Sequence, residues 1–185
     1  MIGAIITVLL IIVTVGLDQV SKLLVVANMS LGQSVDVIPG IFRFTYIHNY
    51  GAAFGSMANS RWIFMILSTV AIIAILVYIF WKKPQDKLLL ASLGLIAGGG
   101  IGNMIDRVCL GYVVDFLDFC AFPKLWMWIF NVADACVCIG AGILLLWMIL
   151  DIIKDEKAKK IAADTPVVEG TDEDGKIAED GEDNA

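Results

Sequence analysis

The chain has 185 residues, of which 59% are hydrophobic, and its mean hydropathy is +0.83. Soluble globular domains are less apolar, so these values exclude that class and indicate an integral membrane protein of one domain. The net charge of −6 is unevenly distributed. Residues 1–150 carry a net +1, and residues 151–185 carry a net −7. The acidic pI of 4.6 therefore comes from the C-terminal segment, and no nucleic-acid-binding surface is expected.

Four apolar stretches are long enough to cross a membrane as helices of about 20 residues. They are residues 2–27, 62–81, 88–105 and 129–150. Asp18 and Lys22, in the first stretch, share one helix face at a spacing of i, i+4, and either form a local ion pair or face a site. In the third stretch Gly94, Gly98 and Gly102 recur at every fourth position, which favours close helix packing.

The segments between the spans predict less regular structure. In residues 41–49 aromatic side chains alternate with others, which predicts a strand. Its sheet should lie on the membrane surface, because an open sheet edge cannot lie in lipid. His48 is expected to pack at this interface rather than to act in catalysis. Residues 109–128 are predicted to form an external loop or a short interfacial helix.

Basic residues predict the orientation of the spans. Lysines follow the second span at residues 82–87 and the fourth span from residue 154, which places both termini in the cytoplasm by the positive-inside rule. The fold class expected is an all-α integral membrane protein, a four-helix transmembrane bundle with a small extracytoplasmic β-sheet. Residues 1–153 would form the membrane domain, and residues 154–185 a disordered acidic cytoplasmic tail.

This orientation brings the polar residues of the spans to one side of the membrane. They are Asp18, Lys22, Asn49, Asn103, Arg107, Asp115, Asn131 and Asp134. Because ionisable groups are costly in hydrocarbon, at about 2.5–3.5 kcal/mol each even on insertion scales, a single site near the outer leaflet is predicted. Asp134 lies about five residues into the predicted fourth span, hence ~7–8 Å deep at ~1.5 Å per residue.

Asp115 and Asp134 form the predicted catalytic pair. Two carboxylates around one water in a dry pocket resist double ionisation, so that one acts as a base while the other acts as an acid. This chemistry fits peptide hydrolysis, but intramembrane carboxylates also serve proton relays and ion pathways. The residues alone leave protease and transporter equally open, with a non-catalytic lipid-binding scaffold as a third hypothesis. Asp106 is interpreted as structural, and Asp118 as an interfacial residue outside the site.

The cysteines and the histidine do not suggest a metal site. The chain has four cysteines and one histidine, too few and too scattered for a zinc site or a Cys/His nucleophile. The cysteines are interpreted as small buried hydrophobes.

Four sequence blocks, taken in order, resemble those of the lipoprotein signal peptidases (signal peptidase II). The blocks are LDQVSK (17–22), NYGAAFG (49–55), GGGIGNMIDRVCLGYVVDF (98–116) and FNVADA (130–135). The resemblance spans residues 10–150 and implies an intramembrane aspartic endopeptidase. Its substrate would be a prolipoprotein carrying diacylglycerol on a cysteine, cut just before that cysteine.

The resemblance also implies a role for each site residue. The catalytic pair of the family falls on Asp115 and Asp134. Its substrate-binding residues fall on Asp18, Lys22, Asn49, Gly51, Asn103, Arg107 and Asn131. No metal or cofactor is implied. The expected partners are prolipoprotein and membrane lipid, in the bacterial cytoplasmic membrane, with the protein itself a monomer.

Overall fold

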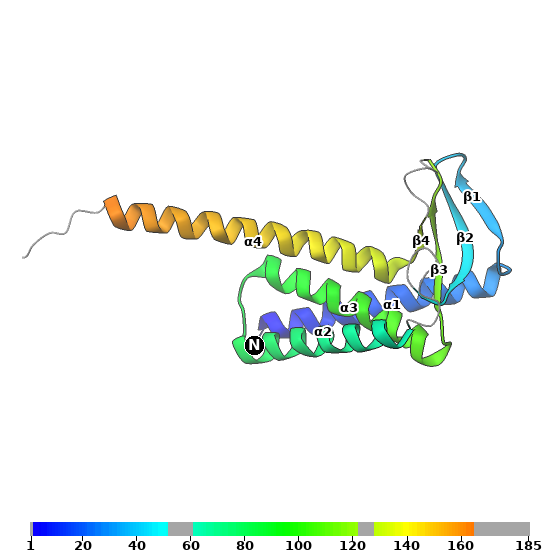
Figure 1. The fold of residues 1–185 in the computed structure, drawn as a ribbon, viewed down its shortest axis with the longest axis horizontal. Helices are drawn as coiled ribbons and strands as arrows, with labels where there is room; N and C mark the ends of the chain where they lie inside the picture. Colours follow the sequence, from blue (N-terminus) through cyan, green and yellow to red (C-terminus); the bar gives the residue numbers. More distant parts are fainter. Residues whose placement is uncertain (1, 52–60, 122–127, 165–185) are drawn as a thin grey trace, which may run out of the picture. The chain divides into compact units, whose positions relative to one another are not determined.

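A computed structural model describes residues 2–51, 61–121 and 128–164 of the chain. The elements, in order, are α1 (Ile2–Asn28), β1 (Ser34–Ile38), β2 (Phe42–Asn49), α2 (Arg61–Lys82), α3 (Lys87–Cys109), β3 (Val113–Phe119), β4 (Ile129–Phe130) and α4 (Val132–Asp164) (Figure 1). The chain separates into two compact units, residues 1–149 and residues 150–185. The sheet and the predicted site residues all belong to the first unit.

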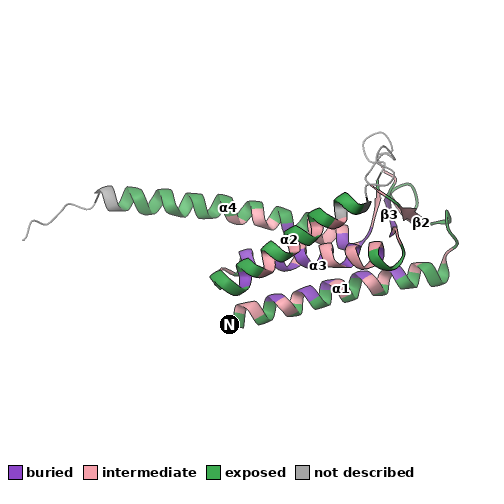
Figure 2. Cartoon of the chain, turned by 60° about the horizontal axis from the view of Figure 1, so that its bottom comes forward, coloured by how far each residue is buried: buried purple, intermediate pink, exposed green. Residues whose placement is uncertain are grey.

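Within the described residues, four helices are long and apolar enough to cross a membrane, as the sequence predicts. Polar side chains are buried and apolar side chains are exposed on these helices, the reverse of the arrangement in a soluble protein. Helix α1 buries Thr7, Asp18 and Lys22 but exposes Leu17 and Leu23 (Figure 2). A helix with its more apolar face outward is stable only where its surroundings are apolar, so the burial pattern itself indicates lipid around the helices.

Helix α3 is the central helix, and α1 and α2 both pack against it. Its glycines allow the close approach that their spacing predicts. A Cβ atom at Gly98 would lie 2.7 Å from Thr14 Cβ on α1. A Cβ atom at Gly102 would lie 2.6 Å from Asp18 Oδ2. The small residues therefore bring the backbone of α3 directly against the polar face of α1.

The four strands form one antiparallel sheet in the order β1-β2-β3-β4. Strand β2 confirms the strand predicted at residues 41–49. The loop or short helix predicted for residues 109–128 is wrong for Val113–Phe119, which form β3. Both faces of this strand are largely buried, so it lacks the alternating pattern of a half-exposed strand. Residues 122–127 lie outside the described part of the chain.

The predicted start of the fourth span is wrong. Ile129 and Phe130 pair with β3 instead of starting the helix, so α4 begins at Val132. Asp134 is therefore in the first turn of α4, not five residues inside a span. At the other end α4 continues to Asp164, past residue 153, where a disordered tail was predicted to begin.

Candidate active site

Asn131 joins the two predicted catalytic residues. Its side-chain Nδ2 donates a hydrogen bond of 2.6 Å to Asp115 Oδ1 on β3. Its Oδ1 accepts the backbone N–H of Asp134 at 2.9 Å, and Asp134 Oδ2 accepts the backbone N–H of Asn131 at 3.3 Å. This exchange is the capping-box arrangement, with Asn131 as the N-cap of α4. The residue that starts the helix thus also links the two carboxylates.

Asp115 is fully buried and held on both carboxylate oxygens. Asn49 Nδ2 donates to its Oδ2 at 2.8 Å, opposite the bond from Asn131. Gly51 N–H donates to Asn49 Oδ1 at 3.0 Å, which turns the amide nitrogen of Asn49 toward Asp115. Burial, and then the negative charge of Asp134, raise the pKa of Asp115 from 3.8 to about 7, against the two amide hydrogen bonds.

Asp134 is partly exposed and is fixed from the side of α3. Asn103 Nδ2 donates to Asp134 Oδ1 at 2.7 Å. Arg107, one turn further along α3, donates to the backbone oxygen of Asn103 at 3.3 Å. Its positive charge also acts on Asp115 and Asp134. The guanidinium therefore partly compensates the negative charge that the two carboxyl groups carry.

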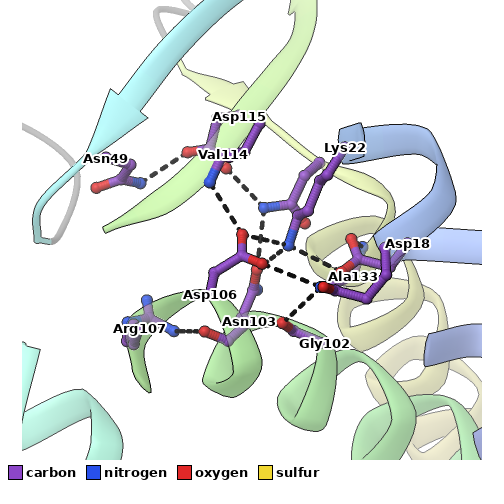
Figure 3. Close-up of polar contacts among 12 residues, drawn as sticks. Asp18, Lys22, Asn49, Gly102, Asn103, Asp106, Arg107, Val114, Asp115 and Ala133 are labelled. Carbon is purple, nitrogen blue, oxygen red and sulfur yellow. Dashed lines mark hydrogen bonds and ion pairs between the residues drawn. The ribbon is translucent and has the colours of Figure 1, made fainter. Parts of the chain in front are cut away.

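A buried charge cluster supports these residues (Figure 3). Lys22 Nζ lies 2.8 Å from Asp18 Oδ2 and 3.0 Å from Asp106 Oδ2, and all three side chains are almost completely buried. Lys22 Nζ also donates to Asn103 Oδ1 at 3.0 Å. Because that oxygen is an acceptor, the amide nitrogen of Asn103 must face Asp134. Lys22 thus orients a group that touches the site.

The two carboxylates of this cluster each hold a backbone amide next to a catalytic residue. Asp18 Oδ1 accepts the N–H of Ala133 at 2.9 Å, and Asp106 Oδ2 accepts the N–H of Val114 at 3.0 Å (Figure 3). Ala133 directly precedes Asp134, and Val114 directly precedes Asp115. The first helix and the third helix therefore fix the backbone at both halves of the pair.

Sequence reasoning missed Gln19 as a member of this cluster. Its Nε2 lies within hydrogen-bonding distance of Asp18 Oδ2 (3.1 Å), Asp106 Oδ1 (3.0 Å) and the backbone oxygen of Gly102 (3.1 Å). Its position between Asp18 and Lys22 in the LDQVSK block was the available signal. Gln19 joins α1 to α3 beneath the site.

The structure brings together all nine residues that the resemblance singled out, but in two layers. Asn49, Asn103, Asn131 and Arg107 surround Asp115 and Asp134, and Gly51 orients Asn49. Asp18 and Lys22 lie in the second layer, where their side chains contact Ala133, Asp106, Asn103 and Gln19. Their contacts support the residues that surround the pair.

Asp118 and His48, which were predicted to have no catalytic role, lie elsewhere on the sheet. Asp118 pairs with Arg43 at 2.6 Å and with Thr45 at 2.9 Å. The same contact raises the pKa of the Arg43 guanidinium. His48 stacks on Tyr112 at 3.7 Å between ring centroids, and burial lowers its pKa. In the described part of the chain the side chains of Asp118 and His48 thus contact residues of the sheet and its turn, not Asp115 or Asp134.

The described residues offer no metal site, and their cysteines form no disulfide. In residues 2–51, 61–121 and 128–164 no group of three or more His, Cys, Asp or Glu side chains could hold a metal ion. All four cysteines are free thiols, and Cys109 and Cys138 are exposed on the bare protein. The interpretation of the cysteines as buried hydrophobes is therefore wrong for these two, although Cys138 lies on a helix apolar enough to face lipid.

Comparison with known proteins identifies the family. The model of the family "Signal peptidase (SPase) II" matches residues 10–150. The lipoprotein signal peptidase of Symbiobacterium thermophilum is 45% identical over 148 residues, which are 78% of this chain and 94% of that protein. That of Desulfitobacterium hafniense is 40% identical over 156 residues, 82% of this chain and 100% of its own length.

A solved structure also matches. A bacterial membrane enzyme determined at 2.3 Å by the in meso method superimposes with a TM-score of 0.72 and 31% identity, covering 79% of this chain and 88% of that one. Fold and sequence thus agree, and the chain belongs to the signal peptidase II family.

Proposed function

We propose that this protein is an intramembrane aspartic endopeptidase that removes the signal peptide from prolipoproteins. The proposed cut lies just before a cysteine that carries diacylglycerol. The observation that carries this proposal is the bridge through Asn131, which holds the carboxylates of Asp115 and Asp134 within one hydrogen-bond network. The two residues come from a strand and a helix, so the pair exists only in the folded protein.

The proposed chemistry needs one proton shared by the pair. The ionised carboxylate takes a proton from water as that water attacks the scissile carbonyl. The protonated carboxyl polarises the carbonyl and then protonates the leaving nitrogen. A pKa of about 7 for Asp115, raised by burial and by Asp134, supports a proton held at the pair near neutral pH. The pair titrates as a unit, so the proton belongs to both carboxyls.

An apolar groove next to the site supports a lipid-modified, hydrophobic substrate. The groove has a volume of about 270 Å³ and lies between α2, α3 and α4. Its lining includes Gly100, one turn before Asn103, and Val137, one turn after Asp134. The apolar part of a substrate in this groove would therefore extend along the helices directly from the catalytic pair.

The proposed topology follows from the charges. The α2–α3 turn carries Lys82, Lys83 and Lys87. It lies at the opposite end of these helices from β3, the strand that holds Asp115 (Figure 1). With this turn in the cytoplasm, both termini are cytoplasmic and the pair is near the outer leaflet, where the lipidated cysteine of a precursor would lie. The protein is proposed to act as a monomer.

The direct test is to incubate the purified full-length protein with lipidated and with unlipidated precursor and to analyse the products by mass spectrometry. The expected product from the lipidated precursor begins at its modified cysteine, and the unlipidated precursor remains intact. Equal cleavage of both forms, or cleavage at another bond, would contradict the proposed substrate. Proton or ion flux in liposomes without cleavage would instead support a transporter, and a scaffold would show neither activity.

A further inference from the structure

A second apolar cavity lies at the other end of the helices. It has a volume of about 310 Å³ and lies between the first half of α1 and the end of α2. Its lining consists of Ala4, Ile5, Val8, Leu9, Ile79, Phe80 and Lys83. This volume is at the lower end of the range for ligand pockets, about 300–1,000 Å³. None of the lining residues belongs to the candidate active site.

Among the described residues that line the cavity, Lys83 is the only charged one, and its backbone has an unusual conformation. Its φ angle is +49°, in the left-handed region that residues with a Cβ atom rarely adopt. It directly follows α2, at a position where helices usually have glycine. The turn is held by a bond of 3.2 Å from Lys83 N–H to Ile79 O and one of 2.7 Å from Gln85 to Lys83 O.

The charges around this cavity are mostly positive. Lys82 and Lys87 flank the same turn. The acidic residue of the turn, Asp86, accepts the N–H groups of Leu88 and Leu89 as the N-cap of α3, at 2.9 and 3.1 Å. An apolar cavity with a lysine among its lining residues, at the end of two membrane-spanning helices, is complementary to an acyl chain joined to a negatively charged headgroup.

We propose that this cavity binds one anionic phospholipid, with an acyl chain between α1 and α2 and its phosphate against Lys83. Both helices pack against α3, and the lipid would fill the space that remains between them. The net positive charge of the turn selects an anionic lipid over a zwitterionic one. The site is independent of the proposed peptidase activity, because it lies at the opposite end of α1 and α3 from Asp115 (Figure 1).

The probe is phosphatidylglycerol, with phosphatidylcholine as the zwitterionic comparison, titrated into the purified full-length protein in detergent. Native mass spectrometry measures retained lipid, and thermal unfolding measures stabilisation. The wild-type protein should retain one phosphatidylglycerol and be stabilised by it more than by phosphatidylcholine. Equal retention and equal stabilisation by the two lipids would overturn the proposed selectivity.

Two variants and one matched control locate the site. Lys83→Gly removes the charge at a position where glycine fits the backbone, and should weaken phosphatidylglycerol binding about fivefold, as one lysine near an anionic surface implies. Ala4→Phe fills the cavity and should abolish retention. Lys82→Gln removes the same charge outside the lining and should bind nearly as the wild type does. Equal losses in Lys82→Gln and Lys83→Gly, or full retention in Ala4→Phe, would show only diffuse attraction and overturn the proposal.

Discussion

Asp18 and Asp106 stand in the same relation to the two halves of the proposed catalytic pair. Asp18 accepts the N–H of the residue before Asp134, and Asp106 accepts the N–H of the residue before Asp115. Lys22 lies between the two carboxylates and neutralises them in part. The relative position of the catalytic residues therefore depends on a buried charge cluster that touches neither of their carboxyl groups.

Removing Lys22 should lower the stability of the protein by more than the loss of its own ion pairs and hydrogen bond. Lys22→Met would leave Asp18 and Asp106 buried without their cation, and breaking such a buried pair costs about 3–5 kcal/mol. Adding Asp106→Asn to Lys22→Met removes one of the two uncompensated charges and should restore part of the lost stability. Thermal unfolding in detergent measures both. A double variant less stable than Lys22→Met would contradict this account of the cluster.

Asn131 should be required for cleavage beyond its role as a helix cap. Asn131→Ser keeps a good N-cap but is too short to bridge Asp115, so stability should change little while cleavage falls about 10²-fold through misplacement of the pair. Asn131→Ala should lose the same activity and, in addition, about 1 kcal/mol of stability from the missing cap. Near-normal cleavage by Asn131→Ser would show that the bridge is not needed.

Gly102 should not tolerate a methyl group, whereas Gly100 should. A Cβ atom at Gly102 would lie 2.6 Å from Asp18 Oδ2 and 3.3 Å from Ala133 Cβ, so Gly102→Ala must displace the Asp18 carboxylate, which accepts the N–H of Ala133 at the start of α4. The expected loss is about 1–3 kcal/mol of stability, together with most of the activity. At Gly100 the nearest atom would be Ile72 Cδ1 at 3.4 Å, an ordinary contact. Thermal unfolding should therefore separate the two variants, with Gly100→Ala close in stability to the wild type; an equal loss of stability in both would argue against close packing at the site.

The pKa of Asp115 predicts the pH dependence of both activity and stability. Because this pKa is raised from 3.8 to about 7, the shared proton is lost above about pH 7 and the cleavage rate should fall there. The native state binds this proton more tightly than the unfolded state does. Its contribution to stability is therefore complete below about pH 4 and is lost as the pH rises through about 7.

Asp115→Asn tests the same shift without relying on activity. This variant cannot ionise at position 115, so its stability relative to the wild type should rise between about pH 4 and pH 7 and then stay constant. The total rise should be about 1.4 kcal/mol for each unit by which the pKa of Asp115 is raised. Thermal unfolding of both proteins across this range measures the difference. A pH-independent difference would contradict the raised pKa.

Much of this architecture was predictable from the sequence, because helices that cross a lipid bilayer must be long and apolar. Long apolar stretches predicted the four helices, and the ordered blocks predicted the residues that gather around Asp115 and Asp134. The apolar run at Val113–Phe119 did not reveal a strand, because a strand buried on both faces has no alternation. Ile129 and Phe130 looked like the start of a helix, although the Asn131-x-x-Asp134 spacing was a capping signal.

The roles of Asp18, Lys22 and Gln19 also required the structure. Sequence spacing showed that Asp18 and Lys22 share one helix face, but it could not show what covers that face. In the fold, α3 covers it with Gly102 and Asp106, which makes this a dry, internally satisfied cluster. The contacts of Asp18 and Lys22 add a supporting role, and the substrate-binding role that the resemblance implies for them stays a prediction.

The most direct test of the central claim is to compare three isosteric substitutions in one cleavage assay with lipidated precursor. Asp115→Asn and Asp134→Asn should each insert and bind precursor but lose cleavage by at least about 10³-fold, because each removes an acid–base group. Asp118→Asn, on the same strand as Asp115 but paired with Arg43, should retain most of the activity. Near-normal cleavage by either Asp115→Asn or Asp134→Asn, with Asp118→Asn inactive, would contradict the assignment of the catalytic pair.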